Sequence, residues 1–257
     1  MPGFEFTTVL MTVALFVGII LALEIGRRLG VRSFSGDKQG EGAGAVEAAL
    51  FGLLGLLIAF TFSGAAARFD ARRQLIIDEA NNIGTAYLHI DLIAAEAQPA
   101  LRERFREYVD SRLAVYQKVP DTAAVNAELE RSQKLQYEIW TMAVAACRES
   151  SWTPSGTLLL PAINDMIDIT TTRTMTAKMH PPLIVFVMLI VLILASALLA
   201  GFGTAKAKTR SWIHIVIFAV ILSATVYVIL DIEYPRLGLI RVDSFDKVLV
   251  DLRNSMN

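Results

Sequence analysis

Few side chains in this sequence are of the kinds that carry out covalent or metal chemistry. The 257 residues include one cysteine, Cys147, and three histidines, His89, His180 and His214. A single cysteine cannot form an intrachain disulfide or a cysteine-based metal cluster, and the histidines lie too far apart for a usual metal-ligand spacing. The sequence also lacks the common nucleophile, zinc-protease, phosphate-loop and dinucleotide-binding signatures. We therefore expect no catalytic residue, no metal site and no cofactor, and a protein that is not an enzyme.

Two hydroxyl groups near the end of an apolar segment are the first residues to suggest a function. Thr61 and Ser63 alternate there with Phe60 and Phe62. A hydroxyl that faces a pore can coordinate a partly dehydrated ion, so these four residues are candidates for lining a pore. Residues two apart on a helix point in nearly opposite directions, so only one of the two hydroxyls can face a given axis. The alternative is that each hydroxyl bonds to a backbone carbonyl one turn earlier.

A polar stripe follows further along the same expected helix. Steps of four, three and four residues place on one helix face Asp78, Asn82, Thr85 and His89. In a ring of subunits this stripe would line a hydrophilic vestibule, and His89 would make it sensitive to pH. A solvated helix face explains the same spacing, so both interpretations stay open.

Charged residues gather just after two of the apolar segments: Arg68, Arg72, Arg73, Asp231, Glu233 and Arg236. Salt bridges or contacts with lipid headgroups would account for this interfacial cluster. The alternative is a basic ring that concentrates anions at a pore mouth. The chain has 24 Lys and Arg against 25 Asp and Glu, a net charge of −1, which gives little support to an anion-concentrating ring. The same balance argues against nucleic acid as a partner.

Four apolar segments must position these residues. The chain is 54% hydrophobic and 19% charged, with a mean hydropathy of +0.50. A helix of about 20 apolar residues crosses a bilayer, and this requirement is met at residues 7–25, 45–63, 183–201 and 212–230. Glu24 and Glu47 are the only charged residues in these segments when histidine is counted as neutral. The sequence therefore predicts a multi-pass membrane protein with four transmembrane helices in two hairpins.

The stretch between the two hairpins predicts a helical soluble domain. No proline occurs from Ala45 to Gln98, so the second span can continue into this domain as one helix. Alternating steps of four and three residues predict a packed seam on that helix at Ile76, Ala80, Ile83, Tyr87, Ile90 and Ala94. Another helix is expected to start near Pro161, which a first helical turn tolerates. The predicted fold is an all-α membrane protein with a first transmembrane hairpin at 1–63, an extended helical soluble domain at 64–181, a second hairpin at 182–230 and a C-terminal tail at 231–257.

The short loops within the hairpins suggest an orientation. They contain seven basic residues: Arg27, Arg28, Arg32, Lys38, Lys206, Lys208 and Arg210. Short loops rich in Lys and Arg usually face the cytoplasm. We therefore expect cytoplasmic short loops, with both termini and the soluble domain on the outside.

Three separated segments of the chain carry a family resemblance. They are residues 52–63 together with 68–73, residues 79–88 and residues 230–240. These segments resemble a bacterial membrane-protein family called bestrophin-like, a domain of unknown function, over most of the chain. The resemblance implies a location in the bacterial inner membrane and kinship with pentameric anion channels. In those channels the second span lines the pore with aromatic and aliphatic side chains, as Phe60 and Phe62 would here, and the helical domain is cytosolic.

These observations support two hypotheses. The first is a homo-oligomeric ion channel with the second span nearest the axis, whose partners are membrane lipid, inorganic ions and other copies of the chain. The glycines of that span, Gly52 and Gly55, and the nearby Gly64 would allow helices to approach closely within or between subunits. The second hypothesis is a non-conducting membrane scaffold or sensor whose helical domain docks a partner.

Overall fold

The computed structural model describes residues 2–33, 43–119, 121–149, 154–206 and 211–256. Three residues that entered the predicted orientation, Lys38, Lys208 and Arg210, lie outside the described residues. Over the described ranges the chain is helical and has no strand, which confirms the all-α prediction. In chain order the α-helices and 3-10 helices (η) are α1 (Pro2–Ser33), α2 (Ala43–Leu88), η1 (His89–Leu92), α3 (Gln98–Gln117), α4 (Thr122–Glu149), α5 (Pro154–Lys178), α6 (Leu183–Gly203), η2 (Thr204–Lys206), α7 (Trp212–Glu233), η3 (Asp243–Asp246) and α8 (Lys247–Ser255).

Four helical stretches are long and apolar enough to cross a membrane. They are Phe6–Ser33, Gly44–Leu92, Ser155–Gly203 and Trp212–Glu233. Each contains one of the four predicted apolar segments, and α2 continues past its apolar segment without interruption. The pairing of these helices into two hairpins around a soluble domain stays a prediction.

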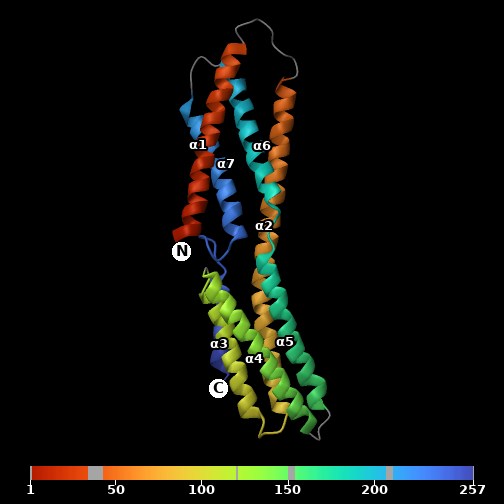
Figure 1. Cartoon of the computed structure of the whole chain (residues 1–257). Coiled ribbons are helices and arrows are strands. Elements are labelled where there is room, and N and C mark those ends of the chain that lie inside the picture. The colour runs from red at the N-terminus through yellow and green to blue at the C-terminus, as the bar shows by residue number, and fades with distance from the viewer. Residues whose placement is uncertain (1, 34–42, 120, 150–153, 207–210, 257) are drawn as a thin grey trace. The chain divides into compact units, whose positions relative to one another are not determined.

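One compact unit of the chain consists of residues 1–68 and 180–239. It contains α1, the first part of α2, α6 and α7, which run alongside one another in Figure 1. Its core consists of buried apolar side chains from these helices: Leu15, Ile19, Leu23, Leu54, Ala65, Leu189, Ile193, Ala197, Ala219, Val226 and Ile229. In this unit apolar side chains also cover much of the surface, as expected for helices that face lipid.

The closest helix contact within this unit joins α1 to α6 through glycines. A Cβ atom on Gly26 would lie 1.9 Å from the carbonyl oxygen of Leu198, and one on Gly201 would lie 2.0 Å from that of Leu23. Both distances are far below any real contact, so only glycine fits at these two positions. In contrast, a Cβ atom on Gly52 or Gly55 would have nothing within 4 Å. The close approach predicted for those two glycines therefore does not occur within the described part of this chain.

The second compact unit consists of residues 69–179 and 240–257. Its core includes five members of the predicted seam, Ile76, Ala80, Ile83, Tyr87 and Ile90. The sixth member, Ala94, is exposed. This expectation was wrong because α2 ends at Leu88 and continues as η1, which changes the helical period and buries Ile93 instead.

The predicted start of the helix near Pro161 was also wrong. The helix α5 begins at Pro154 and includes Pro161 in its interior. A proline inside a helix removes one backbone hydrogen bond. The buried side chains of Leu159, Ala162, Ile163 and Met166 provide the packing that offsets this loss.

The C-terminal segment belongs to the second unit. The side chains of Leu249 and Met256, on and just after α8, are buried in its core. Nε of Arg253 donates to Oδ1 of Asp110 on α3 at 2.8 Å. The stretch predicted as a tail thus ends in a helix that packs against α3.

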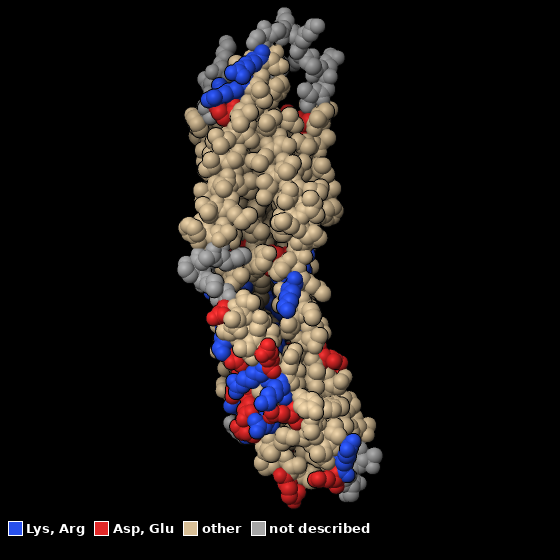
Figure 2. All heavy atoms as spheres, in the orientation of Figure 1, with Lys and Arg blue, Asp and Glu red and all other residues tan. Residues whose placement is uncertain are grey.

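The surfaces of the two units differ in charge. On the face shown in Figure 2, the first unit is largely free of charged residues apart from its ends, whereas the second unit carries many charges of both signs. This is the distribution expected when the helices of the first unit face lipid and the second unit faces water.

Candidate functional site

The apolar part of α2 has one face that the described residues of this chain leave uncovered. Steps of four, three and four residues place on it Gly52, Leu56, Ala59 and Ser63, all of them exposed. Only 6% of the most apolar stretch of α2 is buried, whereas 22 to 28% of the corresponding stretch is buried in the other three apolar helices. Among the described residues, the helix that the sequence placed nearest to a pore axis is therefore the least buried of the four apolar helices.

The four pore-lining candidates point in different directions around α2. Phe60 and Phe62 are 66% and 43% exposed, and Ser63 is exposed on the uncovered face. Thr61 is half-buried, and its hydroxyl donates to the backbone oxygens of Leu57 at 2.8 Å and Ile58 at 3.0 Å. The back-bonding alternative thus describes Thr61, and Ser63 is the hydroxyl that lies on the exposed face.

Two residues of the predicted charge cluster, Arg68 on α2 and Glu233 at the end of α7, form a tight ion pair in the first unit. Nη2 of Arg68 donates to Oε2 of Glu233 at 2.6 Å, and Nε of Arg68 lies 3.0 to 3.1 Å from both carboxylate oxygens. Nδ1 of His180, in the link between α5 and α6, lies 2.9 Å from Oε1 of Glu233. The Glu233 side chain has no exposed surface. The His180 ring also stacks on Tyr234, with centroids 4.5 Å apart. Through its bonds to Arg68 and His180, Glu233 connects the end of α7 to α2 and to the link before α6.

The other members of the predicted charge cluster have separate roles. Oδ1 of Asp231 accepts a hydrogen bond from the backbone N–H of Leu239 at 2.9 Å and so closes the turn after α7. Arg236 belongs to the segment that Asp231 holds. In the second unit, Nη2 of Arg72 donates to the backbone oxygen of Met179 at 2.9 Å.

Arg73 is also engaged within the second unit. Its Nη1 donates to Oδ1 of Asp70 at 3.1 Å, and its guanidinium lies 4.2 Å from the ring centroid of Phe245. The three arginines therefore bind three different partners within the chain, and their part in a basic ring at a pore mouth stays a prediction.

Two of the four stripe residues bond to the backbone of α5. Nδ2 of Asn82 donates to the oxygen of Asp165 at 3.2 Å, and Nδ1 of His89 lies 3.1 Å from the oxygen of Leu158. Asp78 accepts a hydrogen bond from Gln74, and Thr85 is exposed. Two of the four stripe residues, Asn82 and His89, thus make contacts between helices. The role of the stripe in lining a vestibule stays a prediction.

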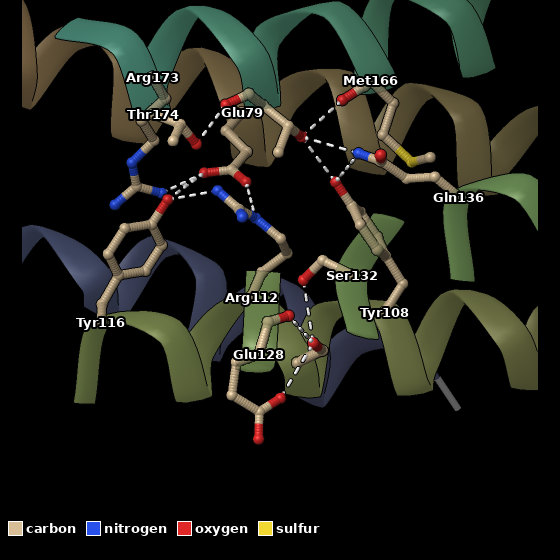
Figure 3. A network of polar contacts seen from close by, with 12 residues as sticks. Glu79, Tyr108, Arg112, Tyr116, Glu128, Ser132, Gln136, Met166, Arg173 and Thr174 are labelled. Atoms are coloured by element: carbon tan, nitrogen blue, oxygen red, sulfur yellow. Dashed lines mark hydrogen bonds and ion pairs between the residues drawn. The ribbon is translucent and has the colours of Figure 1, made fainter. Parts of the chain in front are cut away.

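The second unit contains a buried network of charged groups that sequence reasoning missed. Nε of Arg112 on α3 donates to Oε1 of Glu79 on α2 at 2.5 Å, and Nη1 of Arg173 on α5 donates to Oε2. The side chains of Glu79 and Arg112 have no exposed surface, and that of Arg173 is 5% exposed. Figure 3 shows the Glu79 carboxylate between the two guanidinium groups, with the Tyr116 hydroxyl beside them.

The network reaches the C-terminal segment as well. Nη2 of Arg173 lies 3.3 Å from Oδ1 of Asp246 in η3, and the Arg173 guanidinium lies 3.7 Å from the ring centroid of Tyr116. The negative charges of two carboxylates thus balance the positive charges of two guanidinium groups within the second unit. A signal was present in the sequence, because Glu79 lies three residues after Ile76 and four before Ile83 and so falls on the apolar seam.

Hydroxyl groups extend the polar interior between α3, α4 and α5. The Tyr108 hydroxyl lies 2.7 Å from Oγ1 of Thr170, and Nε2 of Gln136 donates to both oxygens. Burial raises the pKa of the Tyr108 hydroxyl, so this group stays protonated and able to donate. Nearby, the hydrogen bond from Lys118 holds the pKa of the Glu128 carboxyl below its usual range.

Among the described residues, no three His, Cys, Asp or Glu side chains come together as they would to hold a metal ion. Each of the two carboxylates with no exposed surface, Glu79 and Glu233, is paired with basic side chains. The arrangement can hold helices in register, and it leaves one face of α2 uncovered.

These features define a class of protein: a helical protein with four helices apolar enough to cross a membrane and a second, charged helical unit. A family model described as Bestrophin-like domain matches residues 12–244, and the chain belongs to this Bestrophin-like family. Comparison with curated proteins and with solved structures finds no match. The family membership confirms the resemblance seen in the sequence, and together with the apolar helices it fits a membrane protein.

Proposed function

We propose that this chain forms a homo-oligomeric ion channel in which the exposed face of α2 faces the common axis. The observation that carries the proposal is the exposed face itself, with Gly52, Leu56, Ala59 and Ser63 left uncovered by the other helices. Helices in membranes associate through small residues that let backbones approach. Such a face on the least buried apolar helix is suited to neighbouring copies of α2.

The proposed pore carries one hydroxyl group on this face, that of Ser63. Its position near the end of the apolar segment would place a ring of hydroxyls at one mouth of the pore. Phe60 and Phe62, exposed on either side of the face, would pack between neighbouring subunits or narrow the opening. Thr61 has its hydroxyl committed to its own helix and is not part of the proposed lining.

The test is modification of a single cysteine in protein reconstituted into liposomes. In a Cys147→Ser background, Ser63→Cys is treated with a charged thiol reagent, and ion flux is expected to fall several-fold. Ala65→Cys is the matched control, because Ala65 has no exposed surface and lies two residues away. Absence of flux for anions, cations and protons in the unmodified protein would reject the channel, and flux that modification of Ser63→Cys leaves unchanged would reject α2 as its lining.

The second candidate is a non-conducting scaffold or sensor whose charged helical unit docks a partner. The second unit exposes large side chains that a docking partner would cover, among them Tyr137 at 73% and Leu88 at 66%. A stable complex captured by crosslinking at Tyr137, together with a monomeric particle without flux, would favour this function. We propose no catalytic activity in either case.

A further inference from the structure

A recess of about 150 Å³ opens between α2, the start of α6 and α7 in the first unit. Its walls are apolar side chains, including Leu57 and Phe60 of α2, Val185 of α6 and Ile229 of α7. One end is lined by Gly64 and by the guanidinium of Arg68. The recess thus joins an apolar trough to a single cationic group.

The position of the recess matches the boundary of the membrane. Leu57 lies within the apolar segment 45–63 and Arg68 lies beyond it, about 16 Å further along α2 at 1.5 Å per residue. Val185 belongs to the first turn of α6, where the third apolar segment begins. Two helices therefore indicate independently that the apolar end lies in hydrocarbon and the Arg68 end lies at the level of headgroups.

The Arg68 guanidinium has donors left for a ligand. Its Nε and Nη2 are engaged with Glu233, whereas Nη1 makes no hydrogen bond to any residue in the described part of the chain. A Cβ atom on Gly64 would lie 3.3 Å from Nη1, so the absence of a side chain at Gly64 keeps this edge open. The carboxylate of Glu233 has no exposed surface while Arg68 is 30% exposed, so an anion that enters the recess meets the guanidinium.

We propose that this recess binds a glycerophospholipid, with one acyl chain along the apolar walls and a phosphate oxygen accepting hydrogen bonds from Nη1 of Arg68. A guanidinium suits phosphate because its planar donors match phosphate oxygens. The apolar walls add the affinity of a buried hydrocarbon chain. The lipid would hold α2 against α6 and α7 at the membrane boundary.

Native mass spectrometry of the full-length, delipidated protein tests the site. The probes are a dioleoyl phosphatidylglycerol, the dioleoylglycerol that has the same chains without phosphate, and inorganic phosphate without chains. We expect the phospholipid to be retained about tenfold more than dioleoylglycerol, the effect of one charge-assisted hydrogen bond, and inorganic phosphate not to be retained. Equal retention of phospholipid and dioleoylglycerol would overturn the role of Arg68, and retention of inorganic phosphate alone would mean an ion site without a lipid.

Variants distinguish lipid bound in the recess from lipid that surrounds the protein. Gly64→Leu fills the recess without removing the Arg68–Glu233 pair and should lower phospholipid retention about tenfold. Ala14→Leu adds a side chain on the exposed surface of α1 and should leave retention unchanged. Val185→Trp blocks the opposite wall and replaces Gly64→Leu if that variant does not fold. Equal retention by the recess variants and Ala14→Leu would overturn the proposal.

Discussion

At the scale of residues, the buried ion network around Glu79 is the most demanding feature of the second unit. A carboxylate without exposed surface is costly unless its charge is balanced, and here two guanidinium groups balance it. The groups come from α2, α3 and α5, so the cost of burial is offset only when all three helices are in place. Such a network favours one arrangement of these helices over others.

Replacing Glu79 should therefore destabilise the protein strongly. Glu79→Ala leaves Arg112 and Arg173 buried without their carboxylate, and we expect a loss of about 3–5 kcal/mol in the free energy of unfolding. Equilibrium unfolding in detergent, followed by tryptophan fluorescence, measures it. Asn81→Ala is the matched control, because Asn81 belongs to the same family segment but is exposed. Equal stability of the two variants would show that the network is not a structural lock.

At the scale of elements, α2 combines two environments in one helix. Its first part is apolar and has an exposed face, whereas its second part carries the buried seam residues from Ile76 to Tyr87 and the Glu79 carboxylate. The helix α1 contrasts with it, because its glycine contact with α6 leaves no space at the crossing. The glycine crossing thus holds α1 against α6, and α2 is the helix through which the proposed oligomer would form.

The α1–α6 crossing should not tolerate a side chain at Gly201. Gly201→Val would force the two helices apart, because its Cβ would lie 2.0 Å from the Leu23 backbone oxygen. We expect a loss of about 3 kcal/mol or more, at the upper end of the cost of overpacking. Thermal unfolding in detergent is the measurement, and Gly44→Val, with nothing within 4 Å, is the control. A midpoint unchanged in Gly201→Val would contradict the close approach of these helices.

At the scale of the whole molecule, the open question is which side of the membrane holds the charged unit. The basic short loops predict the outside, whereas the expectation drawn from the family resemblance is the cytosol. Both alternatives concern the same structure, because the packing within each unit does not depend on the orientation.

Labelling of a single cysteine decides between these orientations. In a Cys147→Ser background we expect a membrane-impermeant thiol reagent to label Glu130→Cys, on the exposed surface of α4, in intact cells. Arg28→Cys, on the exposed surface of α1 near its end, should be labelled only after the cells are opened. The reverse pattern would place the charged unit in the cytosol and would show that the basic loops do not set the orientation.

Much of this molecule could be predicted from its sequence, because the determining signals are local. Hydropathy over about 20 residues located the four apolar helices, and alternating steps of four and three located five of the six seam residues on α2 and η1. The absence of proline between Ala45 and Gln98 predicted the continuous α2. The family resemblance is local in the same way, because it rests on three short segments of the chain.

Only the tertiary structure decided which groups meet. Glu79 lies 33 residues from Arg112 and 94 from Arg173, and Arg68 lies 165 from Glu233, so no periodicity in the chain relates them. Within the described part of the chain, glycines such as Gly26 and Gly201 make close helix contacts whereas Gly52 and Gly55 do not, because a glycine's role depends on what packs opposite it. The sequence by itself determined helices and their apolar faces, which depend on neighbours three or four residues away. The partners of buried charges and the free face of α2 depend on how helices cross, and that geometry exists only in the folded chain.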